Sequence, residues 1–131
     1  MTAWRWISIE AALAIHDEQL AEHGGAAGTR DRGGLQSALA PAKNLGAHGE
    51  PDAASLAAAY ASGVVRNHPF VDGNKRTAWL LARLFVARNG CELNFDAADA
   101  VVRMLALAAG ELSEDDFARW LRERISAVWP L

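Results

Sequence analysis

The sequence predicts an all-α fold, a compact single-domain bundle of about six helices, for three reasons. The chain has 131 residues, of which 28 are Ala, the residue with the highest helix propensity. Val, Ile and Thr, which favour strands, together number only 14. Apolar residues recur at helical spacing along much of the chain. Its length fits one domain over residues 1–131, with a core large enough to fold without a disulfide or a metal.

The composition also excludes several classes of protein. No apolar run approaches the roughly 18 residues of a membrane-spanning helix, and the first residues lack the apolar stretch of a secretory signal. The single cysteine, Cys91, can form neither an internal disulfide nor a cysteine-based zinc site, and we expect it to be buried. These features predict a protein of the reducing cytoplasm. A net charge of −3 argues against broad binding of nucleic acid.

The first two helices are predicted from their apolar spacing and their end signals. Residues 8–22 carry apolar residues three and four positions apart, with Ser8 as the expected cap and Gly24-Gly25 as the stop. The second helix is expected from its cap at Asp31 to about residue 45, bent or interrupted at Pro41, since proline removes a backbone hydrogen bond.

The next two helices enclose the most polar turn of the chain. After a loop over 46–51, the third helix is expected to start near Asp52 or Ser55 and to run to about residue 67. The fourth is expected over about 75–89, where Gly90 ends it. These two would be the central helices of the bundle, and the polar segment between them is the candidate active-site loop.

The last part of the chain predicts an extended segment and two shorter helices. Residues 91–95 are too few for a helix and are expected to be extended. Asp96 is the expected cap of the fifth helix, which ends at Gly110, and Ser113 caps the sixth. The buried face of the sixth helix is expected to consist of Phe117, Trp120, Leu121 and Ile125.

The candidate chemistry lies in residues 68–76, His-Pro-Phe-Val-Asp-Gly-Asn-Lys-Arg. His68 is the one side chain there that can accept a proton near neutral pH, and Pro69 directs it away from helical backbone angles. Asp72 offers a carboxylate suited to a hard cation such as Mg²⁺. Gly73 permits a left-handed turn, and Asn74 can cap the following helix or contact a ligand.

Lys75 and Arg76 lie in the first turn of the predicted fourth helix, where positive charges are unfavourable. Cations in a first helical turn are unfavourable by about 0.3–1 kcal/mol each, because the helix dipole is positive there. The segment from Arg66 to Arg88 nevertheless holds five cations and only one acid within an acidic chain. A bound phosphate would stabilise both the cations and the free backbone N–H groups of the helix start. The pattern therefore predicts a phosphate and metal site with a base beside it.

At these residues the chain resembles the Fic/Doc family, whose signature is His-Pro-Phe-x-Asp/Glu-Gly-Asn-Gly-Arg-x-x-Arg. Lys75 and Trp79 depart from it, at its second Gly and its final Arg. Both departures match the Doc (death-on-curing) branch, the toxins of type II toxin–antitoxin systems. Further segments look Doc-like in place and order: Ala14-Ile15-His16-Asp17, Gly24-Gly25, Arg30-Asp31, Ser37-Ala38-Leu39 and Gly110-Glu111-Leu112-Ser113.

The resemblance implies a toxin that transfers the γ-phosphate of ATP to a Ser or Thr hydroxyl of a target protein. The implied target is elongation factor Tu, so that translation stops. His68 would be the general base and Asp72 would hold Mg²⁺. The implied phosphate-binding residues are Gly73, Asn74, Lys75 and Arg76, with Arg66 as a further candidate for a phosphate or target contact.

Two other functions stay open at this stage. Fic proteins usually transfer AMP from ATP instead, but their final Arg, which holds the γ-phosphate, is replaced here by the uncharged Trp79. An inactive module that binds an antitoxin and helps it to repress transcription is the second alternative. The presence together of His68, Asp72, Asn74 and Arg76 argues against that degenerate site.

The resemblance also implies a partner. Many Fic proteins carry an inhibitory helix with the pattern Ser/Thr-x-x-x-Glu-Gly/Asn, and no Glu in this sequence is followed by Gly or Asn. We therefore expect a separate Phd-like antitoxin, supplied in trans, whose C-terminal segment folds onto this domain. Neither membrane binding nor direct nucleic-acid binding is expected, except through the antitoxin.

Several other conspicuous side chains have plainer interpretations. His16 lies on the apolar face of the first helix and is expected to be a buried, hydrogen-bonded structural residue. Trp120 is expected in the core. Trp4, Trp6 and Trp129 are expected either to pack on the domain or to line a binding groove, and residues 4–6 to form a short extended arm.

Overall fold

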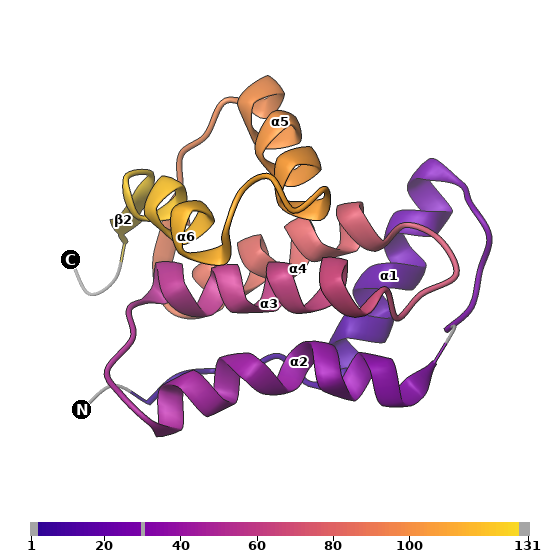
Figure 1. Cartoon of the computed structure of the whole chain (residues 1–131), viewed down its shortest axis with the longest axis horizontal. Helices are drawn as coiled ribbons and strands as arrows, with labels where there is room; N and C mark the ends of the chain where they lie inside the picture. Colours follow the sequence, from indigo (N-terminus) through magenta and orange to yellow (C-terminus); the bar gives the residue numbers. More distant parts are fainter. Residues whose placement is uncertain (1–2, 30, 129–131) are drawn as a thin grey trace.

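The computed structural model describes residues 3–29 and 31–128, and within them it has six helices and one small sheet (Figure 1). The all-α prediction is confirmed. Arg30 and Trp129 lie outside the described residues. The helices are α1 (Ile9–His23), α2 (Arg32–Ala47), α3 (Ala53–Asn67), α4 (Asn74–Arg88), α5 (Ala97–Ala108) and α6 (Glu114–Arg122), and the antiparallel strands are β1 (Cys91–Leu93) and β2 (Ile125–Ala127).

Side-chain caps begin five of these helices, as the sequence predicts. In each case a hydroxyl or carboxylate oxygen accepts a hydrogen bond from a backbone N–H of the first turn. The five capping residues are Ser8, Asp31, Asp52, Asp96 and Ser113. Helix α4 differs, because its N-cap is Gly73 and no side chain caps it.

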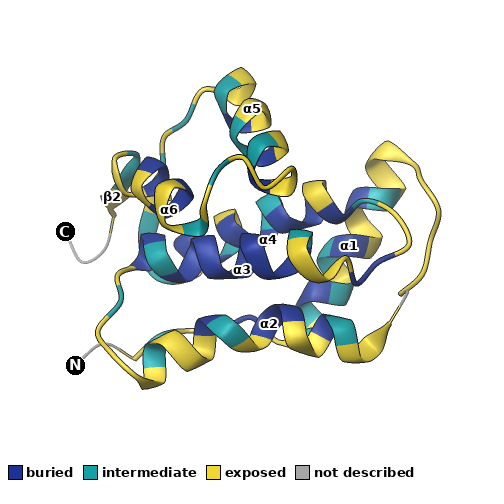
Figure 2. Cartoon of the chain, viewed as in Figure 1, coloured by how far each residue is buried: buried dark blue, intermediate teal, exposed yellow. Residues whose placement is uncertain are grey.

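Helix α3 is the centre of the bundle. From Ala53 to Val64 every residue except Ser55 is buried, and the helix packs against α2, α4 and α6 (Figure 2). Its small residues permit this close packing. A Cβ added at Gly63 would lie only 2.0 Å from the carbonyl oxygen of Ala38 in α2, so these two helix backbones come into direct contact.

Two sequence expectations about α2 need correction: an interruption at Pro41 and an end near residue 45. The helix is continuous through Pro41 and extends to Ala47, so the loop predicted from residue 46 begins only at His48. Proline removes one backbone hydrogen bond from a helix. Buried side chains on both sides of Pro41 hold α2 against the core and offset that loss: Leu35, Ala38, Leu39 and Ala42.

The C-terminal segment holds a further correction. Helix α6 ends at Arg122, and Ile125 belongs to β2, where it pairs with Leu93, instead of to the helix face. The predicted extended segment is confirmed as β1, but its partner lies more than 30 residues further along the chain. Cys91 is half-buried in this strand, not buried as predicted. Trp120 is in the core, as expected.

The N-terminal arm packs on the domain. The Arg5 backbone exchanges two hydrogen bonds with the Asn89 side chain, and the rings of Trp4 and Trp6 lie 5.7 and 6.0 Å from that of Phe85. These two tryptophans therefore cover the core beside α4. Among the described residues, no helix is long and apolar enough to cross a membrane.

The contact of Gly63 with Ala38 generates a stability prediction. Gly63→Ala should lower the free energy of unfolding by about 2 kcal/mol or more, because overpacking outweighs the ~1 kcal/mol that Ala gains over Gly in a helix. Urea denaturation measures this change. Gly49→Ala is the control, because the nearest atom to its added Cβ is 4.0 Å away. Equal stability of the two variants would contradict the close approach of α2 and α3.

Candidate functional site

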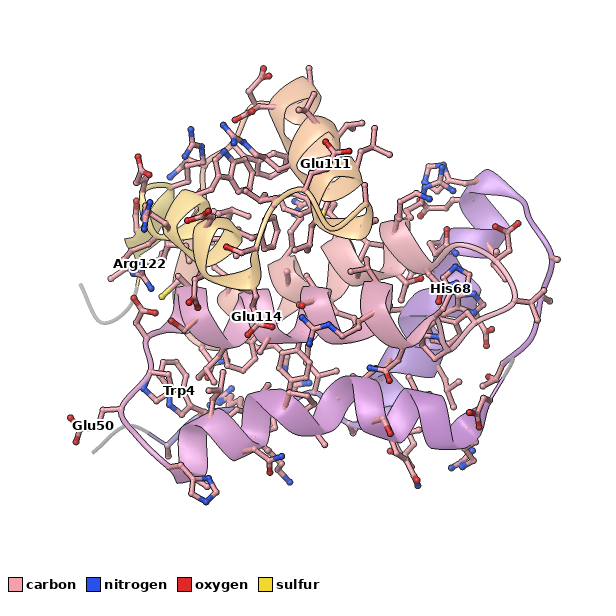
Figure 3. The ribbon with its side chains drawn as sticks, viewed as in Figure 1. Trp4, Glu50, His68, Glu111, Glu114 and Arg122 are labelled. Atoms are coloured by element: carbon pink, nitrogen blue, oxygen red, sulfur yellow. The ribbon has the colours of Figure 1, made fainter. Side chains whose placement is uncertain are left out.

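The loop between α3 and α4 holds the candidate site. A second loop is hydrogen-bonded to this loop. Between α1 and α2, the described residues 24–29 and Asp31 run beside it. The Val71 N–H donates to the Gly28 carbonyl at 3.0 Å, and Thr29 and Phe70 form an antiparallel bridge. Figure 3 shows His68 just beyond the end of α3, on the side of α1 and far from Arg122. The site is therefore built where α1, α3 and α4 meet.

His68 has an unusual backbone conformation. It is the C-cap of α3 with φ 50° and ψ 54°, and among the described residues no other non-glycine residue has a positive φ. Its N–H still donates to the Val64 carbonyl at 2.9 Å. Left-handed backbone costs a residue with a side chain about 1–2 kcal/mol, and such strain is concentrated at functional sites. The prediction that His68 leaves right-handed helical geometry before Pro69 is confirmed.

Asn74 closes the loop from the first residue of α4. Its Oδ1 accepts the N–H of Phe70 at 3.0 Å, and its Nδ2 donates to the Phe70 carbonyl at 2.9 Å. The same Nδ2 lies 3.3 and 3.4 Å from the two ring nitrogens of His68. Asn74 is only 5% exposed, so its visible role is to hold the loop and the imidazole. Its predicted contact with a phosphate stays a prediction.

His16 in α1 holds the loop between α3 and α4 through two contacts. Its ring stacks on that of Phe70, with centroids 3.8 Å apart and planes 6° apart, and its Nε2 lies 2.8 Å from the Asp72 carbonyl oxygen. The Nε2–H donates in that bond, because a carbonyl can only accept. The side chain is 2% exposed. The structural role predicted for His16 is confirmed.

Asp72 presents an ionised carboxylate to solvent. Its two oxygens accept the N–H groups of Ala26 at 3.2 Å and Gly73 at 2.8 Å. The hydrogen bond from Ala26, followed by that from Gly73, lowers the pKa of Asp72 below its usual value. Hydrogen bonds to the charged form have this effect. An exposed carboxylate that stays ionised fits the Mg²⁺ role predicted for it.

The start of α4 completes a pocket that we call the His68 pocket. Gly73 has φ 77°, and no side-chain acceptor caps the helix start, where Gly73, Lys75 and Arg76 line the pocket. The volume of the pocket is about 240 Å³. Its lining is His68, Val71, Asp72, Gly73, Asn74, Lys75 and Arg76. The structure thus brings together every predicted site residue except Arg66.

Arg66 lies in a different cleft. Its guanidinium donates to Ser62 Oγ at 2.9 Å and lies 3.8 Å from a carboxylate oxygen of Glu114 in α6. That cleft, of about 340 Å³, runs between α3 and the segment from α5 to α6. The described contacts of Arg66 therefore connect α3 to α6, and a phosphate contact of Arg66 stays a prediction.

A residue that the sequence did not indicate also touches the site. Gln19 in α1 is 2% exposed, and its Oε1 accepts a hydrogen bond from Arg76 Nη1 at 3.3 Å. A Cβ added at Gly73 would lie 2.1 Å from Gln19 Nε2. The only sequence signal was that Gln19 follows His16 by three positions, on the same helix face. An amide does not titrate, so Gln19 is not among the acid–base residues that indicate a site in a sequence.

A larger groove adjoins the His68 pocket along α4. It has a volume of about 520 Å³ and lies between α4 and α5; we call it the α4–α5 groove. Lys75 and Arg76 line both cavities. Most of its remaining lining is apolar and comes from Trp79, Phe95, Ala97, Ala100, Val101, Met104 and Leu105, with the cation Arg83 at its side.

Comparison with known proteins shows relatives along most of the chain. Residues 6–86 match the model of the Fic/DOC family, and this range includes the whole His68 pocket. A protein of Escherichia phage P1 named Protein kinase doc is 34% identical over 119 residues, which are 90% of this chain and 94% of the phage protein. A protein of Mycolicibacterium smegmatis named Toxin Doc is 38% identical over 99 residues, 72% of this chain and 76% of that protein.

The contact of Gly73 with Gln19 can be tested against a matched glycine. Gly110 has the same backbone conformation, φ 78°, but an added Cβ would meet nothing within 4 Å. Gly110→Ala should therefore cost about 1 kcal/mol, from the left-handed backbone alone. Gly73→Ala should cost about 0.5–1.5 kcal/mol more, because its Cβ also displaces the end of the Gln19 side chain, which then loses its hydrogen bond to Arg76. Chemical denaturation compares the two, and equal losses would contradict the contact.

Proposed function

Because the chain belongs to the Fic/DOC family, we propose that it is a toxin that transfers the γ-phosphate of ATP to a Ser or Thr hydroxyl of a target protein. One relative is named a protein kinase, which supports phosphate transfer, and the other is named a toxin, which supports the toxin role. Elongation factor Tu is the target that the family resemblance suggests. Its modification would arrest translation in the cytoplasm.

The observation that carries the proposal is the make-up of the His68 pocket. A helix start without a side-chain cap, two cations, a carboxylate and a histidine line one cavity. Free N–H groups and a positive dipole at a helix start bind phosphate, and Lys75 and Arg76 add charge-assisted hydrogen bonds. Cations in the first turn of a helix are unfavourable by themselves, but a bound anion between them would offset that repulsion.

The proposed transfer needs little covalent chemistry from the protein. The target hydroxyl oxygen forms a bond to the γ-phosphorus, the bond to the oxygen that bridges the β- and γ-phosphorus breaks, and ADP leaves. His68 accepts the hydroxyl proton. Mg²⁺ held by Asp72 would neutralise phosphate charge. No group of three or more His, Cys, Asp or Glu in the described residues could hold a metal alone, so phosphates and water would complete its coordination.

Phosphoryl transfer is favoured over AMP transfer by the lining of α4. The Fic signature has its final Arg, which would hold the γ-phosphate, at the position of Trp79. Here the Trp79 ring packs edge-on against Phe95, with centroids 5.0 Å apart, and lines the α4–α5 groove. It offers no charge to a γ-phosphate. Lys75 also adds a side chain where that signature has Gly, so the nucleotide pose of AMP transfer is disfavoured.

The reaction is tested with ATP labelled at either end of its triphosphate. Incubation with elongation factor Tu should transfer label from γ-labelled ATP and none from α-labelled ATP. His68→Ala should lower the rate by about 10²–10⁴-fold, the usual contribution of a general base. His48→Ala is the control, because His48 is exposed at the end of α2 and donates to the Asn44 carbonyl. It should leave the rate unchanged.

Each other outcome identifies a different function. Label from the α position alone would show AMP transfer. Label on other proteins of a cell extract, with none on elongation factor Tu, would move the target elsewhere. A wild-type chain that neither labels any protein nor arrests growth when expressed would indicate the inactive co-repressor module.

We further propose that a Phd-like antitoxin neutralises this chain by occupying the α4–α5 groove. The groove is apolar along α5 and carries Lys75, Arg76 and Arg83 along α4, so it suits an acidic amphipathic segment. Val101 and Leu105 line it and are 59% and 52% exposed. Because Lys75 and Arg76 also line the His68 pocket, an acidic occupant would withdraw the cations that phosphate needs.

A pair of adjacent valines tests this docking. Val101→Glu should weaken antitoxin binding by about 10- to 100-fold, because it puts a carboxylate on the apolar wall that an acidic segment contacts. Co-expressed antitoxin should then no longer prevent growth arrest. Val102→Glu is the control, because Val102 is 60% exposed on the same helix but does not line the groove. Equal neutralisation of both variants would contradict docking in this groove.

A further inference from the structure

Gln19 is buried at the site without a role in the transfer described above. It projects from α1 and is 2% exposed. Its Oε1 accepts from Arg76 Nη1, whereas its Nε2 has no hydrogen-bond partner among the described residues. A buried amide N–H group without an acceptor is destabilising and rare in native proteins. The presence of Gln19 at this buried position therefore needs a physical reason.

The contact with Arg76 explains the orientation of this amide. A guanidinium only donates hydrogen bonds, so the amide oxygen must face Arg76. The NH₂ group is then directed to the side of Gly73, where an added Cβ would lie 2.1 Å from Nε2. Turning the amide over would place two donors against each other. The unpartnered Nε2 is therefore the consequence of an acceptor directed at Arg76.

The chemistry of Arg76 shows what such an acceptor can do. Its side chain is exposed, and it belongs to none of the ion pairs among the described residues. A free arginine samples many rotamers, which raises the entropic cost of binding an anion. A neutral acceptor restricts the guanidinium without adding a negative charge beside it. A carboxylate at the same place would restrict it but cancel its positive charge.

We propose that Gln19 is a positioning residue that holds the Arg76 guanidinium at the His68 pocket for a phosphate group of ATP. The inference rests on the proposed function, in which Arg76 binds phosphate. It makes α1 part of the binding machinery, although α1 contributes no lining residue to the pocket. It also gives the reason why position 19 holds a glutamine, which is neutral and accepts a hydrogen bond.

The test measures binding of a non-hydrolysable ATP analogue with Mg²⁺ by calorimetry. Gln19→Met keeps the length of the side chain and removes the acceptor, and affinity should fall about tenfold, as when a partner that orients a binding group is lost. Arg76→Ala should also weaken binding. In the Arg76→Ala background, Gln19→Met should cause no further loss, because Gln19 acts through Arg76. The other glutamine, Gln36, gives the control variant Gln36→Met, which should bind as the wild type does.

Thermal unfolding separates positioning from a purely structural role. Gln19→Met removes a buried donor that has no partner, so its melting temperature should equal or exceed that of the wild type while affinity falls. A structural residue would lose stability without a selective loss of affinity. Gln19→Glu is a second variant of nearly the same shape. It keeps an oxygen for Arg76 but cancels its charge, so the analogue should bind more weakly to it as well.

The outcomes distinguish this inference from the function on which it rests. Unchanged affinity in Gln19→Met or in Gln19→Glu would overturn the positioning role alone. So would an equal, additional loss in the Arg76→Ala background. A wild-type chain that binds no analogue would instead overturn the proposed function, and this inference with it.

Discussion

The anchoring of Phe70 is the constraint on which the rest of the site depends. Its ring is fully buried and stacked on His16, and its backbone N–H and C=O are both bonded to the side chain of Asn74. These contacts hold a six-residue turn that would otherwise be mobile, because exposed loops lack buried contacts. With Phe70 fixed, His68 is held on one side of the turn and Asp72 on the other. Binding groups positioned before a ligand arrives reduce the entropy lost on binding.

The local energetics of this turn oppose folding in two places. His68 adopts a left-handed backbone that favours glycine, and α4 begins with two cations and no side-chain cap. Each feature is unfavourable by about 1–2 kcal/mol. The buried packing of α3 against its neighbours supplies the stability that offsets them. The site is thus a polar, strained turn supported by a largely buried helix, and the strained backbone is that of His68, the proposed general base.

In the proposed function, the two cavities along α4 connect catalysis with its inhibition. They share Lys75 and Arg76, so whatever occupies the α4–α5 groove changes the electrostatic environment of the His68 pocket. The groove exists because α5 leaves part of its apolar face uncovered, with Val101 and Leu105 exposed. An antitoxin bound there would bury that face and would meet the cations of the site at the same time. Inhibition would then need no change in the fold.

Elements with local causes could be predicted from the amino-acid sequence alone. Five of six helices begin at the side-chain caps that it indicates, because a cap and its N–H partner lie within a few residues of each other. The lining of the His68 pocket could be named from the sequence for the same reason, since all its residues fall in one nine-residue segment. Other contacts arise only from the packing of the folded chain. Arg66 turns to Glu114 in α6, Ile125 pairs with Leu93 in a strand, and Gln19 reaches Arg76 across 57 residues of chain. Such contacts depend on how segments far apart in the sequence pack together. That packing involves the whole core, so it cannot be read from residue spacing or composition.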